Sequence, residues 1–215
     1  MPDSLTIKIC GLSTPDTLAA TLNAGADMVG FVFFAPSPRN LTFAKAKQLG
    51  EQAAGRSLKV ALSVDAGDDF LADIVASLQP DRLQLHGKES PARVADIKAR
   101  FGLPVMKAIH VSEHVDLAAI KQYEGIADQL VFDAKPPKGA KLPGGNGAAF
   151  DWTILQDVRT ATQWMLSGGL DAENVGTALR ITRAKAIDIS SGVESRPGVK
   201  DVEKIKTFVR TARGR

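Results

Sequence analysis

Eight short apolar runs, each followed by signals for a helix, constrain the fold of this chain more than any other feature. Proline at a first helical position, as at Pro15 and Pro91, and glycine after the last one, as at Gly25, mark helices between the runs. The runs lie at residues 5–9, 28–33, 59–64, 82–85, 105–109, 130–132, 164–166 and 186–189. We expect helices near residues 15–24, 42–50, 71–78, 91–97, 116–123, 151–158, 171–179 and 202–209.

Regular alternation of strand and helix predicts an α/β fold with a parallel sheet, and eight units favour closure into a TIM barrel. An open, doubly wound sheet has the same alternation, but its glycine fingerprint is missing after the first strand, at Gly11-Leu12-Ser13. We therefore predict a single (β/α)8 barrel domain over residues 1–215, with eight parallel strands. The longest connections, near residues 35–40 and 134–150, follow strands 2 and 6, on the face where barrels build active sites.

The overall composition excludes several classes of protein. A net charge of +3 and scattered basic residues argue against a nucleic-acid surface. Apolar stretches are too short for a membrane span, and the first one is too short for a signal peptide. The lone cysteine, Cys10, excludes an internal disulfide and fits a reducing compartment. We expect a cytoplasmic protein without nucleic-acid or membrane partners, either a monomer or a homodimer.

The first strand carries two candidate functional side chains. Side chains alternate along a strand, so Lys8 and Cys10 share one face while Ile7 and Ile9 share the other. If the isoleucines pack on helices, Lys8 points into the barrel and needs a partner, for which Asp188 on the adjacent last strand is the candidate. A nearby cation would lower the pKa of the thiol and favour the thiolate, which acts as base or nucleophile. The alternative is that Cys10 is a small buried apolar residue.

Two further charged residues lie where a barrel would place chemistry. Asp133 ends strand 6, and a carboxyl there can act as a general acid if desolvation raises its pKa. The alternative is a solvated cap or a partner for Lys135. Arg39, on the long second loop, has the fork geometry that grips a carboxylate with two hydrogen bonds. The alternative for Arg39 is an ordinary surface arginine.

Flexible backbone follows the last two strands. Gly168-Gly169 comes after strand 7 and Ser190-Ser191-Gly192 after strand 8. Barrels often bind phosphate with amides of these two loops and the N-terminus of a short extra helix, so both loops are candidates for a phosphate site.

The three histidines give weaker signals. His86 ends strand 4 and can reach the mouth, although a packed histidine is the alternative. His110 and His114 fall near strand 5, but no two histidines show metal-ligand spacing on one face. We therefore expect no metal site.

Several short motifs together resemble the phosphoribosylanthranilate isomerase family. They are spread in order over nearly the whole chain, which makes the resemblance specific. One departure is Asn146, where the family commonly has a small hydroxyl residue. The motifs are Lys8-Ile9-Cys10-Gly11, Gly30-Phe31-Val32-Phe33, Ser37-Pro38-Arg39, Gln84-Leu85-His86-Gly87, Phe132-Asp133, Gly144-Gly145-Asn146-Gly147, Phe150-Asp151-Trp152, Leu166-Ser167-Gly168-Gly169-Leu170 and Asp188-Ile189-Ser190-Ser191-Gly192-Val193-Glu194.

The resemblance implies an Amadori rearrangement of N-(5'-phosphoribosyl)anthranilate to 1-(2-carboxyphenylamino)-1-deoxyribulose 5-phosphate, in tryptophan biosynthesis and without cofactor. By this likeness Asp133 is the general acid that opens the ribose ring, and Cys10 is the base that removes the C2 proton. Arg39 holds the anthranilate carboxylate, and the backbone of Gly168-Gly169 and Ser191-Gly192 holds the phosphate. The same motifs place further residues at the substrate, namely His86, Gly145, Gly147, Asp188 and Ser190.

Three other functions compete. A histidine-pathway isomerase performs the same chemistry but is expected to carry carboxylates after strands 1 and 5, whereas this chain has a thiol after strand 1. A pentose-phosphate epimerase needs metal-binding histidines and acids, which the sequence does not arrange. A catalytically silent phosphate-binding barrel is disfavoured by the presence of both Cys10 and Asp133.

Overall fold

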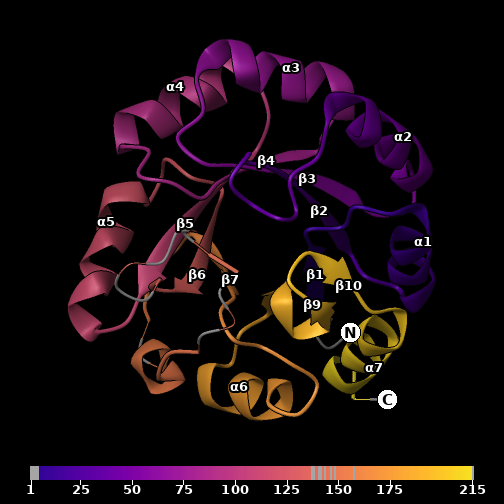
Figure 1. The fold of residues 1–215 in the computed structure, drawn as a ribbon. Helices are drawn as coiled ribbons and strands as arrows, with labels where there is room; N and C mark the ends of the chain where they lie inside the picture. The colour runs from indigo at the N-terminus through magenta and orange to yellow at the C-terminus, as the bar shows by residue number, and fades with distance from the viewer. Residues whose placement is uncertain are drawn as a thin grey trace.

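Eight parallel strands close into a barrel in the computed structural model, which describes residues 5–136, 139, 142, 144–145, 147, 149–156 and 158–214. Neighbours in sequence are neighbours in the barrel, and β1 pairs with β8 to close it (Figure 1). The predicted eight-stranded fold is therefore confirmed, while Asn146 lies outside the described residues. The strands are β1 (Thr6–Cys10), β2 (Met28–Phe33), β3 (Leu58–Ser63), β4 (Arg82–Leu85), β5 (Val105–Val111), β6 (Gln129–Ala134), β7 (Gln163–Leu166) and β8 (Ala186–Ile189).

Helices surround the barrel in an outer ring (Figure 1). The first begins at Pro15 behind the N-cap Thr14 and ends before Gly25, which adopts a φ of +83° that glycine tolerates best. The α-helices are α1 (Pro15–Ala24), α2 (Phe43–Ala53), α3 (Asp68–Leu78), α4 (Pro91–Phe101), α5 (Ile120–Tyr123), α6 (Val175–Thr182) and α7 (Val202–Ala212). None of the described helices is long and apolar enough to cross a membrane.

Two predicted helices are shorter than expected. The one expected at 116–123 is a 3₁₀ helix (η1, His114–Ala119) that runs into the four-residue α5. The one expected at 151–158 is a single 3₁₀ turn (η2, Trp152–Leu155) within the described residues. Aromatic and β-branched side chains at 152–154 lower the helix propensity of this segment, and the Asp151 carboxylate caps it by accepting from the N–H of Thr153.

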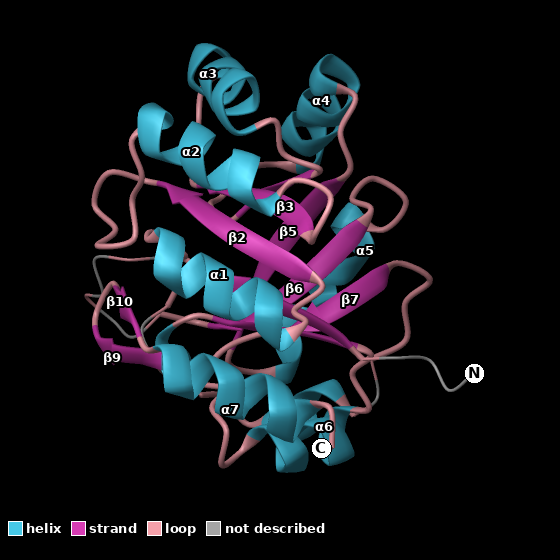
Figure 2. Cartoon of the chain, turned by 90° about the vertical axis from the view of Figure 1, so that its right-hand side faces the viewer, coloured by secondary structure: helices cyan, strands magenta, loops and turns pink. Residues whose placement is uncertain are grey.

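A small hairpin after β8 was not predicted. The antiparallel strands β9 (Glu194–Arg196) and β10 (Val199–Lys200) lie between the 3₁₀ turn η3 (Ser191–Val193) and α7. Figure 2 shows the hairpin at the left end of the barrel, the end toward which the β2 arrow points. It brings Glu194 and Lys200 close to the ends of the barrel strands.

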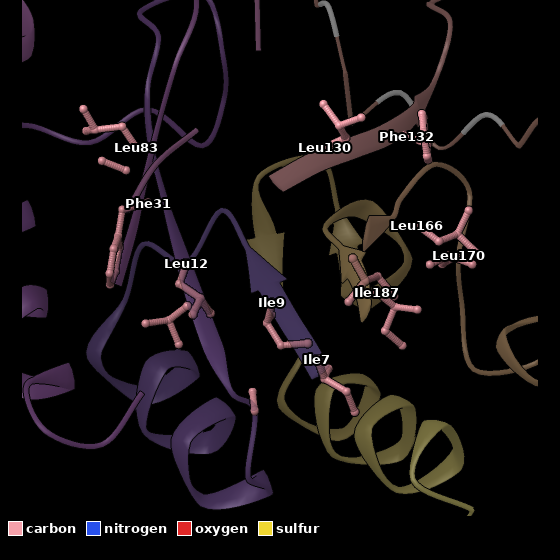
Figure 3. Packing of buried hydrophobic residues seen from close by; sticks show 14 of the residues in the cluster. Ile7, Ile9, Leu12, Phe31, Leu83, Leu130, Phe132, Leu166, Leu170 and Ile187 are labelled. Carbon is pink, nitrogen blue, oxygen red and sulfur yellow. The ribbon is translucent and has the colours of Figure 1, made fainter. Parts of the chain in front are cut away.

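The main hydrophobic core lies between the strands and the helices. Ile7 and Ile9 of β1 belong to it, together with Ile187 of the adjacent β8 (Figure 3). The outward direction predicted for the two isoleucines is therefore confirmed.

A second, smaller cluster fills the barrel interior. Six strands contribute one buried side chain each, and the remaining two, β1 and β4, carry the fully buried polar residues Lys8 and Gln84. The apolar members are Met28, Val60, Met106, Val131, Met165 and Ala186. The interior is thus a packed core of side chains, as is usual for this type of barrel.

Candidate active site

A cavity opens at the carboxyl ends of the strands, with about 800 Å³ of space when its open mouth is included. Gly192 is the predicted site residue that does not line it, since a methyl group there would lie 2.0 Å from the carbonyl oxygen of Leu170. The other predicted site residues line it: Cys10, Arg39, His86, Asp133, Gly145, Gly147, Gly168, Gly169, Asp188, Ser190 and Ser191.

The pairing of β1 with β8 creates a buried ion pair beneath the cavity. Lys8 is completely buried, and its Nζ donates to Oδ2 of Asp188 at 2.9 Å. The two residues lie opposite each other in the β1–β8 register, so the predicted partnership is confirmed. The other oxygen, Oδ1, is buried without a hydrogen-bond partner among the described residues, which leaves an acceptor next to the cavity.

Cys10 ends β1 and reaches the cavity wall, although only 4 % of its surface is exposed. Burial is the largest influence and raises the pKa of the Cys10 thiol. The charges of Lys8 and Lys200 lower this pKa, while that of Asp188 raises it further. The nearby cation thus lowers the pKa of the thiol as expected, but the net pKa is raised because desolvation outweighs both lysines, so the thiolate is not favoured in the ligand-free protein.

Asp133 shows the opposite balance. Burial would raise the pKa of its carboxyl, but a hydrogen bond from His86 and the charges of His86 and His110 hold it below the ordinary value. Its Oδ2 lies 3.1 Å from Nε2 of His86, and its Oδ1 accepts from the N–H of Ala134. The condition set for a general acid, a pKa raised by desolvation, is therefore not met in the ligand-free protein. Lys135 pairs instead with Asp116, so the alternative partnership is wrong as well.

His86 and His110 lie together beside Asp133. Their rings are 5.2 Å apart in an edge-to-face arrangement, and His110 is the register partner of Asp133 on β5. Gln84 holds the other side of His86, with its Nε2 3.2 Å from Nδ1. The expectation of no metal site rested on the spacing of histidines along the chain, whereas His86 and His110 come together across neighbouring strands.

Arg39 is buried, with 5 % of its surface exposed, so it is not an ordinary surface arginine. Its Nε and Nη2 donate to the two carboxylate oxygens of Glu194 at 2.7 and 2.9 Å, and Nη2 also donates to the carbonyl oxygen of Gly145. The fork geometry is as predicted, but its partner is Glu194. Among the described residues, no acceptor takes a hydrogen bond from Nη1, which stays available on the cavity side.

Lys200 completes this network, and its sequence position gave no signal of it. Its buried Nζ donates to Oε1 of Glu194 at 2.8 Å and to the carbonyl and hydroxyl oxygens of Ser190. Burial lowers the pKa of Lys200 to about 8, against the opposing charge of Glu194. Glu194 ends a quoted motif, yet its role was not predicted because the hairpin that positions it was not predicted.

The two loops after β7 and β8 converge on the cavity. Gly168 and Gly169 have φ values of +86° and +65°, which turn the chain sharply after β7. No hydrogen bond joins the backbone N–H of Gly168, Gly169 or Ser191 to another described residue. The hydroxyl of Ser190 donates to the carbonyl oxygen of Cys10 at 3.1 Å and ties the second loop to β1. The backbone N–H groups of Gly168, Gly169 and Ser191 are therefore suited to bind an anion.

Comparison with known proteins identifies the family. Residues 7–211 match the family model described as N-(5'phosphoribosyl)anthranilate (PRA) isomerase. The chain belongs to the PRA isomerase family. Similar curated PRA isomerases include one from Bradyrhizobium sp. (strain ORS 278), 57 % identical over 98 % of this chain and 96 % of that protein. Another, from Nitrobacter winogradskyi, is 58 % identical over 98 % of this chain and 93 % of that protein.

Solved PRA isomerases share the fold. The crystal structure of the Thermotoga maritima protein has a TM-score of 0.88 at 32 % identity and covers 98 % of this chain and all of that one. A PRA isomerase solved with reduced 1-(o-carboxyphenylamino)-1-deoxyribulose 5-phosphate has a TM-score of 0.84 at 30 % identity, over 98 % of this chain and 100 % of that one. The barrel and the isomerase family inferred from the sequence are both confirmed.

Proposed function

We propose that this chain isomerises N-(5'-phosphoribosyl)anthranilate to 1-(2-carboxyphenylamino)-1-deoxyribulose 5-phosphate in tryptophan biosynthesis, with Asp133 as general acid and Cys10 as general base. The observation that supports these roles is that one cavity is lined by both residues, from β6 and β1, together with Arg39 and two anion-binding loops. An aldose-to-ketose rearrangement needs one acid and one base, each worth roughly 10²–10⁴ in rate.

The reaction begins with two proton transfers to and from the side chains. Asp133 gives its proton to the ring oxygen while the bond from that oxygen to C1 breaks, and the nitrogen lone pair forms the iminium. The Cys10 thiolate then takes the C2 proton, and the electrons of that bond form the C1–C2 double bond of an enolamine. Tautomerisation moves the proton of the C2 hydroxyl to C1 and gives the ketone. Cys10 is then protonated and Asp133 ionised, and transfer of one proton from the thiol to the carboxylate through water restores both groups.

The remaining predicted residues bind the substrate. Arg39, Lys200 and Glu194 together carry a net charge of +1, which suits the anthranilate carboxylate at Nη1 of Arg39. The amides of Gly168-Gly169 and Ser191-Gly192 take the phosphate, which lies away from the reacting carbon and supplies orientation. Oδ1 of Asp188 accepts from a ribose hydroxyl. His86 orients Asp133, and the other members that shape the walls are Gly145, Gly147 and Ser190.

The proposal extends to the setting of the reaction. It needs no cofactor, and the enzyme works in the cytoplasm, consistent with its single free thiol. The proposal also includes a single domain over residues 1–215, which is supported by the direct pairing of β1 with β8. The protein is a monomer or a homodimer; a related Thermotoga maritima structure is described as monomers made from a dimeric enzyme.

A fluorescence assay tests the activity and the two roles. Phosphoribosylanthranilate made in situ from anthranilate should lose its fluorescence on addition of the protein, and an unchanged signal would instead favour a silent phosphate-binding barrel. Cys10→Ser and Asp133→Asn should each lower kcat by about 10²–10⁴ with an unchanged circular dichroism spectrum. Near-normal turnover in either variant would remove that residue from its role.

A further inference from the structure

Three consecutive strands of the barrel contribute metal-ligating side chains that lie close together. His86 follows β4, His110 lies on β5 and Asp133 lies on β6. One ligand atom from each residue lies within 4.8 Å of the other two, and the shortest separation given is 3.1 Å, between Nε2 of His86 and Oδ2 of Asp133. The three side chains therefore converge on one point next to the cavity.

These separations suit a transition-metal ion. Around a tetrahedral zinc ion with bonds of about 2.0–2.2 Å, ligand atoms lie roughly 3.3–3.5 Å apart, so small side-chain rotations suffice here. The backbone is well fixed, since His110 and Asp133 are register partners and the N–H of His86 donates to the carbonyl oxygen of Ser63. Two imidazole nitrogens and one carboxylate oxygen favour zinc, cobalt or nickel over magnesium or calcium.

Gln84 supplies an independent observation that points to the same ligand. It is fully buried, and its Oε1 is buried without a hydrogen-bond partner among the described residues. A metal on Nε2 of His86 leaves the ring proton on Nδ1, where it needs an acceptor. Half a turn of the Gln84 amide places Oε1 where Nε2 now lies, 3.2 Å from Nδ1, and provides that acceptor.

We propose that His86, His110 and Asp133 form a binding site for a zinc-class divalent cation, and that the bound ion inhibits the isomerase by occupying the Asp133 carboxylate. The inhibition rests on the role proposed for Asp133, whereas metal binding itself does not. Three protein ligands leave the fourth tetrahedral position to water in the cavity. Zinc-class ions then act as inhibitors of the enzyme and not as its cofactor.

The binding test uses the full chain, freed of metal with a chelator, in buffer without phosphate. Titration with Co²⁺ should produce the visible absorption bands of tetrahedral cobalt, and Zn²⁺ should abolish them. His110→Asn should weaken Co²⁺ affinity at least tenfold, while His114→Asn, the matched control at an exposed histidine, should leave it unchanged. Cys10→Ser should also leave it unchanged; loss of binding in that variant, or retention in His110→Asn, would overturn the proposed ligand set.

The metal ligands can also be tested by NMR on the unaltered protein, without any variant. In ¹⁵N-imidazole NMR spectra, Zn²⁺ should shift the signals of two histidines, His86 and His110, and leave that of His114 in place. A shift confined to His114, or none, would overturn the site.

The inhibition is tested separately. Zn²⁺ should inhibit the isomerase reversibly, chelator should restore it, and half-inhibition of His110→Asn should require at least tenfold more Zn²⁺, each variant being compared with its own metal-free rate. If the spectra show metal binding but the isomerase keeps its activity, the metal site would stand and the proposed inhibition would be overturned. Inactivity of the metal-free protein toward phosphoribosylanthranilate would instead contradict the proposed function, and the cobalt and NMR results would still stand.

Discussion

The two sides of the cavity carry opposite chemistry. On the β1–β8 side, Cys10 is surrounded by the charged groups of Lys8, Lys200 and Asp188. On the β4–β6 side, Asp133 lies against the imidazole rings of His86 and His110. Both reacting groups are buried, so burial pushes both pKa values upward.

The outcome nevertheless differs between the sides. Burial wins at Cys10, whose pKa is raised, while the hydrogen bond and charges of the imidazoles win at Asp133, whose pKa is lowered. In the ligand-free protein the proton therefore lies on the sulfur, whereas the proposed mechanism needs it on the carboxyl. The neighbouring side chains therefore place the acid and the base, but they do not by themselves produce the protonation states that catalysis needs.

The largest expected effect comes from removing the cation on the β1–β8 side. Lys8→Met leaves the Asp188 carboxylate buried without its partner, and breaking a buried pair in this way costs about 3–5 kcal/mol. We expect the free energy of unfolding, measured in urea, to fall by this amount. The double variant Lys8→Met with Asp188→Asn removes both charges and should lose clearly less. Equal losses in the two proteins would contradict a stabilising role for the pair.

Arg39→Ala tests the proposed binding of the substrate carboxylate, because the substrate lies between the two sides of the cavity. Loss of a hydrogen bond to a charged group costs about 1.5–3 kcal/mol, so KM should rise roughly 10- to 100-fold while kcat changes little. Glu194→Gln retains the arginine but weakens its anchor, and should raise KM by a smaller factor. An unchanged KM in Arg39→Ala would remove this residue from the substrate site.

The pH dependence sharpens the contrast between the two pKa shifts. Turnover needs an ionised Cys10 and a protonated Asp133, whose pKa values lie above and below their ordinary 9.0 and 3.8. Between these limits a rise in pH ionises more Cys10 and deprotonates Asp133 in proportion, so kcat/KM, which reports the ligand-free enzyme, should be flat from about pH 5 to 7.5. A narrow bell centred near neutrality, measured with chelator present, would contradict the shifts.

KM should change above this range. Because burial lowers the pKa of Lys200 to about 8, its charge is lost as the pH rises through that value. The positive cluster that faces the substrate anions then becomes neutral, so KM should rise above pH 8 while kcat stays level. Lys200→Met should show the raised KM at every pH.

The smallest effect is expected at Lys135, on the rim beside Asp133. Lys135 is half-exposed and pairs with Asp116 at 3.0 Å. Lys135→Ala should change the free energy of unfolding by less than about 1 kcal/mol, as is usual for surface ion pairs, and should leave kcat unchanged. A large fall in kcat would revive a pairing between Lys135 and Asp133.

The sequence predicted features that depend on local periodicity. Alternation along β1 gave the inward Lys8 and Cys10, and barrel closure then gave Asp188 as the partner. Helix ends followed from proline and glycine, as at Pro15 and Gly25. These features need only the side-chain period and the strand order.

Features that depend on distant contacts were missed. Glu194 grips Arg39 from 155 positions away, through a hairpin too short to show a strand pattern. His110 joins His86 only because β4 and β5 are adjacent in space. The net directions of the two pKa shifts did not follow from the sequence, because each is a balance between burial and particular partners, and sequence position reveals neither contribution.

The pairing of Lys8 with Asp188 also bears on how the protein is made. At about 5–20 residues per second, a ribosome needs roughly 9 to 36 s to add the 180 residues that separate the two partners. Throughout that time the nascent chain has the lysine of its first strand but not the carboxylate that neutralises it. The catalytic centre therefore cannot form strand by strand during translation, and it first becomes complete when the last strand closes the barrel.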